Sequence, residues 1–266
     1  MANWTSYDAA ARCHDAVAGP KFFARPAADL VASVDVHDAG AILDVGTGSA
    51  VAALAARALA PADAQVTGID PSIEMLRTAR RLGLDRVAVA SAPGLPFAGG
   101  AFDRVIANFV VNHMPSYNAG LADMARVLRA GGRLGMTAWG PSQYAPRELW
   151  DALADACVGK DRMAQATRQA IPWEDWLTDP DHVREALAGA GLVAVQVDRR
   201  EYDVRMTRAE YLATREKSVS ARFLRHALAP EEWGRFWQHA VSEFERRFPE
   251  EIAFTRDVWI GTGRKN

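Results

Sequence analysis

The chain has 266 residues, of which 49% are hydrophobic and 24% charged, and its formal net charge is −2. This composition excludes intrinsic disorder, and a chain of this length buries roughly three quarters of its unfolded surface, enough for one large domain or two unequal ones. An isoelectric point of about 6.3 gives no overall attraction to phosphate backbones, so we expect no nucleic-acid partner.

Targeting signals and cysteine usage favour a cytoplasmic protein. The longest apolar run, over residues 50–60, is interrupted by Arg57 and is far shorter than the ~20 residues of a membrane span. Residues 1–15 lack the pattern of a secretory signal. Cys13 and Cys157 offer neither a disulfide framework nor metal-ligand spacing. We expect no metal and no membrane span, a monomer or homodimer, and, from 27 Arg against 4 Lys, a GC-rich bacterial genome.

The first half of the chain alternates short apolar runs with helical stretches, which predicts βα units and a mostly parallel sheet. Strands are expected over residues 41–45, 65–69, 87–90, 102–108 and 133–139. Helices are expected over about 50–60, 71–82 and 117–129, and Ser72 is a suitable N-cap for the second of them.

After residue 140 the rhythm changes, and the remainder holds six of the eight tryptophans. Helical periodicity over 147–168 indicates an insertion. A helix over about 180–190 and a strand over about 192–203 then resume the sheet. At least two more helices are expected over 207–247, and a last strand over about 252–263 closes the chain.

A glycine loop follows the first strand and indicates a nucleoside ligand. Gly46 and Gly48 let the backbone approach a ligand at a helix start. Asp70, 22 residues beyond Gly48 at the end of the next strand, can accept both hydroxyls of a ribose. A dinucleotide fingerprint needs a third glycine where Val51 stands, and Asp44 would repel a pyrophosphate. A cationic ligand suits this loop better, and a nicotinamide oxidoreductase is disfavoured.

Four runs, at residues 42–50, 68–76, 95–103 and 106–108, share their order and spacing with a known family. The chain resembles the class I S-adenosylmethionine-dependent methyltransferases, in the group that includes ubiquinone/menaquinone-type and small-molecule enzymes. The resemblance implies an enzyme with S-adenosylmethionine as cofactor and a small-molecule acceptor. It also implies an α/β, Rossmann-like, doubly wound, seven-stranded, mostly parallel sheet with an antiparallel C-terminal strand and a helical cap.

One domain is then expected over residues 1–266. Its cofactor-binding core would occupy 38–140, its cap insertions about 141–178 and 205–250, and its sheet would be completed by about 192–203 and 252–263.

The resemblance also implies where the cofactor is held. Gly46 and Gly48 would pass under its methionine part, Asp44 would hold its amino group, and Asp70 would bind the ribose. Many relatives have an acidic residue toward the adenine where this chain has Ser91. The full set of expected cofactor residues is Tyr7, Asp44, Gly46, Gly48, Asp70, Pro71, Met75, Ser91, Ala92 and Asn108.

A general base is needed only if the acceptor must lose a proton, and two histidines are candidates. His113 follows the fourth strand at its carboxyl end, where open α/β sheets bind ligands, but it can equally pack against the cofactor loop. His14 lies in a region that resembles the family's amino-terminal helix over the cofactor, where Tyr7 would cover the methionine end. Alternatively, His14 is an ordinary exposed histidine.

The aromatic residues of the second half favour a hydrophobic or aromatic acceptor, methylated at an O or C centre, such as a secondary metabolite or a quinone-like compound. Trp139, Trp173, Trp176 and Phe223 are the candidate substrate contacts, although most such residues pack as cap core. Arg222 and Arg225 could pair with a substrate carboxylate or lie on a solvated helix face.

Missing motifs narrow the choice further. Residues 108–111 read Asn-Phe-Val-Val rather than the tetrapeptide of nucleic-acid amino methyltransferases, and no Gly-x-Ser-x-Gly elbow of a hydrolase is present. The alternative that stays open, because of Ser91 and the aromatic cap, is a methyltransferase-fold cyclase or cofactor-binding protein that no longer transfers methyl groups.

Overall fold

The computed structural model describes residues 4–5 and 21–266, in which seven strands form one sheet of order β3-β2-β1-β4-β5-β7-β6. The first five strands are parallel, and β7 runs antiparallel to both of its neighbours. The predicted fold is confirmed. The strands are β1 (Ala41–Val45), β2 (Gln65–Asp70), β3 (Arg86–Val89), β4 (Phe102–Asn108), β5 (Leu128–Trp139), β6 (Leu192–Thr207) and β7 (Glu251–Lys265).

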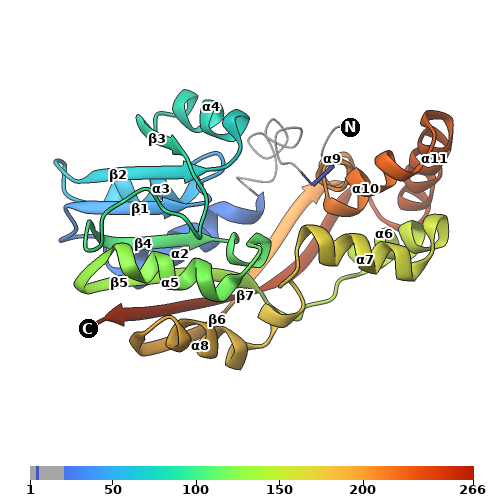
Figure 1. Ribbon diagram of the computed structural model, residues 1–266. Helices are drawn as coiled ribbons and strands as arrows, with labels where there is room; N and C mark the ends of the chain where they lie inside the picture. Colours follow the sequence, from blue (N-terminus) through green and yellow to red (C-terminus); the bar gives the residue numbers. More distant parts are fainter. Residues whose placement is uncertain (1–3, 6–20) are drawn as a thin grey trace.

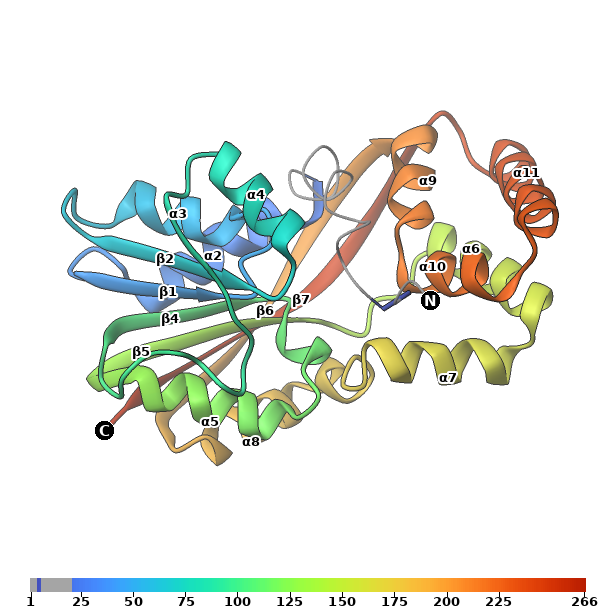
Figure 2. The ribbon, with the colours of Figure 1, turned by 45° about the horizontal axis from the view of Figure 1, so that its top comes forward.

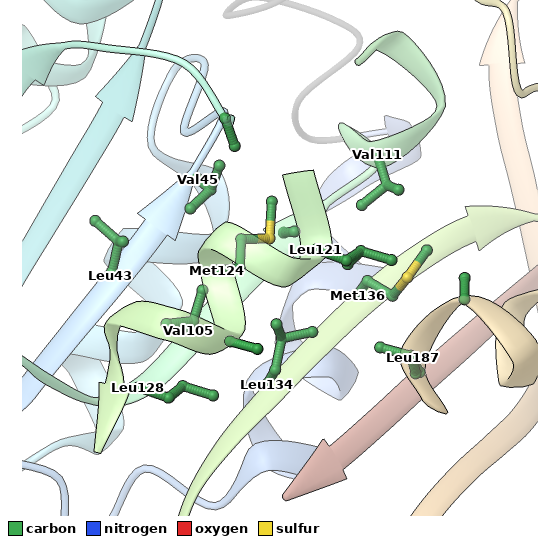
Figure 3. Close-up of a cluster of buried hydrophobic side chains, with 14 of the residues drawn as sticks. Leu43, Val45, Val105, Val111, Leu121, Met124, Leu128, Leu134, Met136 and Leu187 are labelled. Carbon is green, nitrogen blue, oxygen red and sulfur yellow. The ribbon is translucent and has the colours of Figure 1, made fainter. Parts of the chain in front are cut away.

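Helices cover both faces of this sheet (Figure 1). One face packs against α2 (Ala24–Val34), α3 (Val51–Leu59) and α4 (Ile73–Arg81). The other packs against α5 (Tyr117–Val127) and α8 (Pro180–Gly189). Figure 3 shows the second of these cores, in which Leu121 and Met124 of α5 meet Leu134 and Met136 of β5. Apolar strands buried on both faces are typical of a parallel sheet with helices on each side.

Helix α2 is an element that the sequence prediction missed. Its buried residues include Ala27, Leu30, Val31 and Val34, which recur at the three- and four-residue spacing of a helix face. This spacing could have predicted a helix before the first strand.

The boundary between α5 and β5 differs from the prediction of a helix to residue 129 and a strand from 133. Leu128 already pairs with Phe102, and regular pairing resumes at Arg133 with Arg104 after an irregularity. Gly131, at φ 75°, provides the backbone conformation for this irregularity. The glycines therefore lie inside the strand and do not form a connection before it.

Strands β6 and β7 extend beyond the rest of the sheet. The last pair between β5 and β7 joins Trp139 to Val258, whereas β6 and β7 stay paired as far as Thr207 and Glu251. Both strands are longer than predicted. Figure 2 shows this two-stranded extension running from the parallel sheet to the cap helices. One ladder thus joins the two parts of the molecule.

The cap has a hydrophobic core of its own. Its largest fully buried side chains are Trp150, Tyr211 and Phe244, and Val204, Met206 and Ile252 of the extension join them. The helices are α6 (Ala145–Val158), α7 (Lys160–Ala170), α9 (Arg208–Glu216), α10 (Val219–Ala227) and α11 (Pro230–Arg247). Two short 3₁₀ helices, η3 (Val111–His113) and η4 (Trp176–Thr178), lie in the connections.

Candidate active site

A cavity of about 920 Å³ lies where the carboxyl ends of the parallel strands face the cap. Gly46 follows β1, Asp70 ends β2, Asn108 ends β4 and Trp139 ends β5, and all four line it. The cap side is formed by residues of α6, α7, α9 and α10. Ligands of open α/β sheets bind at this edge, and the volume suits a cofactor-sized molecule with a small partner.

The glycine loop brings bare backbone to the cavity. Gly46 and Gly48 have φ values of 68° and 53°, in the left-handed region. A Cβ atom on Gly46 would lie 2.2 Å from a methyl carbon of Val110. The loop is also tied to β2, because the Thr47 N–H donates to the Ile69 carbonyl at 2.8 Å. Only glycine fits at Gly46.

Asp70 is oriented by backbone donors. Its carboxylate accepts from the N–H of Gly48 at 3.0 Å and from the N–H of Ser72 at 2.8 Å. The side chain is buried yet lines the cavity. It therefore stands beside the loop in a fixed orientation, as a group that recognises ligand hydroxyls requires.

Asp44 is a fully buried carboxyl group with an unsatisfied oxygen. Its Oδ2 accepts from the Thr47 hydroxyl at 2.7 Å and from the Ala53 N–H at 3.0 Å. Among the described residues, Oδ1 has no partner. Burial raises the pKa of Asp44 to about 7, the charge of Asp70 acts in the same direction, and the two hydrogen bonds oppose it. A positively charged ligand group would satisfy this carboxylate.

His113 ends η3, lines the cavity and lies near Ala170 and Arg222 of the cap helices. Burial lowers its pKa to about 4, and the positive charge of Arg222 adds to the effect, while a hydrogen bond with the Ala170 backbone opposes it. The imidazole is consequently neutral at pH 7 and can accept a proton.

Aromatic side chains form one wall of the cavity. Phe109 and Trp139 stack with ring centres 3.9 Å apart, and Phe23 packs against both. The guanidinium carbon of Arg256 lies 3.7 Å from the centre of the Trp139 ring, a cation–π contact. Phe109 has φ 55°, and its N–H donates to the Thr137 hydroxyl at 2.8 Å, which turns the chain sharply after β4.

Several predicted site residues lie at this cavity, and others do not. The described residues that line it are Asp44, Gly46, Gly48, Asp70, Pro71, Met75, Asn108, His113 and Trp139. Ser91 and Ala92 are not part of its lining, so their roles toward an adenine stay predictions. Tyr7 and His14 lie outside the described residues.

Three of the four predicted substrate contacts pack away from the cavity. Trp173 donates its indole N–H to the Met114 carbonyl at 2.9 Å, and Trp176 stacks between Tyr117 and His182. Phe223 packs against Trp4. None of Trp173, Trp176 and Phe223 lines the cavity, because each side chain packs against other parts of the chain.

Charged residues of the cap are the part of the site that sequence reasoning mostly missed. Arg222 is buried and lines the cavity, whereas Arg225 is exposed and pairs with Glu216, so the two candidate arginines separate. The basic residues lining the cap side are Arg147, Lys160, Arg168, Arg215, Lys217, Arg222 and Arg256, and the acidic ones are Asp151, Asp155, Glu174 and Asp175. One signal was available: the charged residue Arg256 interrupts the apolar final strand.

No cluster of metal ligands occurs in the described part of the chain. Nor is any helix of residues 4–5 and 21–266 long and apolar enough to cross a membrane.

Comparison with known proteins agrees with this geometry. Residues 43–136 match a family model described as a methyltransferase domain. The chain is 37% identical over 106 residues to a ubiquinone/menaquinone biosynthesis C-methyltransferase UbiE of Geotalea daltonii, covering 36% of this chain and 43% of that protein. It is 33% identical over 134 residues to a demethylmenaquinone methyltransferase of Mycobacterium sp. (strain KMS), covering 48% of this chain and 55% of that protein. The matches thus span about half the length of these curated relatives.

Among solved structures, a phosphoethanolamine N-methyltransferase 2 of Haemonchus contortus superposes with a TM-score of 0.60 at 15% identity. The alignment covers 100% of this chain and 60% of that one. The likeness supports the fold. Residues 43–136 are thus similar in sequence to a methyltransferase domain, and the chain shares its fold with a solved methyltransferase.

Proposed function

We propose that the chain binds S-adenosylmethionine in the cavity and transfers its methyl group to an O or C centre of a small molecule with an aromatic or hydrophobic part. The observation that carries the proposal is the set of Asp44, Gly46, Gly48 and Asp70 around one end of the cavity. It pairs a buried, unsatisfied carboxyl oxygen with bare backbone and with an oriented carboxylate.

The residues fit the parts of this cofactor. Gly46 and Gly48 leave room for the methionine part, and the unsatisfied Oδ1 of Asp44 suits its ammonium group. Asp70 suits the ribose hydroxyls, and Pro71 and Met75 lie next to it for the adenine. The adenine roles of Ser91 and Ala92 and the covering role of Tyr7 remain part of the proposal.

When bound, the cofactor supplies an activated methyl group, so the protein's task is alignment and exclusion of water. The stacked Phe109 and Trp139 rings give one side of the cavity an apolar character that suits an aromatic or hydrophobic acceptor. A hydroxyl acceptor has to lose its proton as its oxygen gains the methyl carbon, and the neutral imidazole of His113 can take that proton at a ring nitrogen. A quinone-like acceptor is favoured because the two curated relatives act, by their names, in quinone biosynthesis.

The division of the chain also remains a proposal. We assign the cofactor to residues 38–140 and the acceptor mainly to the cap segments at about 141–178 and 205–250. The matched methyltransferase domain at 43–136 supports the first assignment.

Calorimetric titration with S-adenosylhomocysteine, the demethylated cofactor, tests binding. We expect Asp70→Ala to weaken binding at least about 100-fold, because the oriented carboxylate is lost and the N–H groups of Gly48 and Ser72 lose their acceptor. Asp63→Ala, which removes an exposed carboxylate on the turn before β2, is the matched control and should bind as the wild type does. Undiminished binding by Asp70→Ala, or none by the wild type, contradicts the proposal.

Incubation of aromatic quinols, both neutral and carboxylated, with methyl-labelled cofactor tests transfer. Label should pass to the acceptor, and His113→Gln should lower kcat more than it changes the affinity for S-adenosylhomocysteine. Binding without transfer to any acceptor would instead favour a cyclase or a cofactor-binding protein.

A further inference from the structure

The cavity wall opposite the glycine loop is built from basic side chains that meet only in the folded chain. Arg147 lies in the first turn of α6, Arg215 in the last turn of α9, and Arg256 on β7. Arg256 lies two residues beyond the last pair of β7 with β5, on the two-stranded extension that reaches the cap (Figure 2). The Tyr144 hydroxyl accepts a hydrogen bond from Nη1 of Arg256 at 3.2 Å and lines the same wall.

These arginines differ in how their charges are balanced. Arg147 forms an ion pair with Asp151 at 3.3 Å. In the described part of the chain, Arg215 and Arg256 have no carboxylate within ion-pair distance. The Nε atoms of both are buried and have no hydrogen-bond partner there. A buried guanidinium without an ion-pair partner is costly, so an anionic ligand group would stabilise this pair.

The electrostatics show this deficit most clearly at Arg256. Burial would lower the pKa of Arg215, but Tyr211, Tyr144 and Asp151 together raise it. Burial lowers the pKa of Arg256, and the neighbouring charges of Arg147 and Arg215 lower it further. Burial alone would raise the pKa of Tyr144, but three guanidinium groups, led by that of Arg256, hold it below its usual value. Seven basic residues face four acidic ones on the cap side as a whole. A region of positive potential therefore lies across the cavity from Asp44 and Asp70.

Geometry selects the kind of anion. The Arg256 guanidinium lies over the Trp139 ring, which restricts its position, and its planar fork of N–H donors matches the oxygens of a carboxylate or a phosphate. An inorganic ion alone would leave the aromatic wall beside it unused, whereas an organic anion would occupy both.

We propose that Arg215 and Arg256 form an anion-binding subsite that holds a carboxylate or phosphate group of the acceptor beside the aromatic side chains of Phe23, Phe109 and Trp139. The inference rests on the proposed methyl transfer for the identity of the occupant. It narrows the acceptor class from hydrophobic aromatic compounds to aromatic compounds that carry an anionic group.

Three probes of similar shape test the subsite: benzoate, phenyl phosphate and neutral benzamide. Each is titrated by calorimetry into the wild-type protein, with and without saturating S-adenosylhomocysteine. We expect at least one anion to bind about tenfold or more tightly than benzamide, and the stronger of the two anions identifies the group. Equal affinity for all three probes overturns the proposal, and this comparison needs no variant.

Variants then assign the effect to residues. Arg215→Gln and Arg256→Gln should each reduce anion affinity to near that of benzamide, whereas Arg215→Lys should keep part of it. Arg225→Gln, on the exposed side of α10, is the matched control and should bind as the wild type does. An equal loss in Arg225→Gln, or none in the two cavity variants, also overturns the proposal. If the wild type binds the anions but not S-adenosylhomocysteine, the subsite stands and the methyltransferase proposal fails.

Discussion

The two ends of the cavity differ in the hydrogen-bond partners of their charged side chains. At the sheet edge, Asp44 and Asp70 accept hydrogen bonds from the backbone of the loop and helix beside them. At the cap, Arg215 and Arg256 project from separate elements, and their buried Nε atoms have no hydrogen-bond partner among the described residues. The difference shows where each kind of specificity resides. The backbone holds the acidic end in one geometry for one cofactor, whereas the basic end has a charge that an acceptor must complete.

The largest expected effect is a loss of stability in the cap that leaves the cofactor end of the cavity intact. Trp150 is fully buried in the cap core, and its indole N–H donates to the Ser220 hydroxyl at 2.8 Å. Trp150→Ala should lower the free energy of unfolding by about 5 kcal/mol, the upper end for such a truncation, because a large cavity results and the Ser220 hydroxyl loses one of its hydrogen bonds. Urea unfolding followed by circular dichroism measures this.

Trp150→Phe is the milder control and should lose less than half as much. At low denaturant, S-adenosylhomocysteine affinity should persist in Trp150→Ala while benzoate or phenyl phosphate binding weakens. A parallel loss of both would show that the two ends of the cavity do not differ in this way.

A second prediction concerns the buried charge at the acidic end. With its pKa raised to about 7, Asp44 holds a proton in the folded protein that the unfolded chain has already released above pH 4. Its contribution to stability therefore falls as pH rises from about 4 to 7, by about 4 kcal/mol for the full shift. His113, with a pKa lowered to about 4, acts in the opposite direction, so stability from it rises between about pH 4 and 6.5.

Comparison with Asp44→Asn isolates the carboxyl group. The free energy of unfolding of the variant should increase relative to that of the wild type as pH rises from 4 to 7, because an amide does not titrate and its contribution to stability does not change with pH. Chemical denaturation at several pH values gives the difference profile. Saturating S-adenosylhomocysteine should flatten it, since a bound ammonium group favours the carboxylate. A flat profile without ligand contradicts the assignment.

A third prediction tests the close approach at Gly46. Gly46→Ala should weaken S-adenosylhomocysteine binding about 100-fold, or about 3 kcal/mol, because the added methyl would meet Val110 at 2.2 Å and displace the loop. Gly131→Ala is the matched control: its φ of 75° is similarly unfavourable, but nothing lies within 4 Å of the new carbon. It should lose about 1 kcal/mol of stability with no change in binding. Equal binding losses would mean that backbone conformation, not the contact, is responsible.

The same contrast explains what could be predicted from the sequence. The acidic end comes from one stretch of the chain, in which the glycines, Asp44 and Asp70 follow successive strands at a fixed spacing. That spacing can be recognised from the amino-acid sequence alone. The basic end joins Arg147, Arg215 and Arg256, which are brought together only by the length of the β6–β7 extension. Trp173 and Trp176 were predicted at the acceptor because aromatic type alone does not distinguish a cavity wall from packing against Tyr117.

The smallest expected effect lies at the edge of the same loop. Ala50 is fully buried at φ 69°, the left-handed conformation that costs an alanine about 1 kcal/mol relative to glycine. Ala50→Gly relieves that strain but removes a buried methyl group worth about 0.8 kcal/mol. We therefore expect the free energy of unfolding to stay within about 0.5 kcal/mol of the wild type, and S-adenosylhomocysteine affinity within about twofold.

Ala52→Gly provides the comparison, because Ala52 is also buried but lies inside α3. There the substitution relieves no strain, lowers helix propensity by about 1 kcal/mol and removes the same methyl group. The two variants should differ by more than 1 kcal/mol in urea unfolding. If Ala50→Gly is destabilised as much as Ala52→Gly, the left-handed conformation at the loop edge carries no strain. The acidic end would then be held by its hydrogen bonds and by the contact at Gly46, without a conformational term at Ala50.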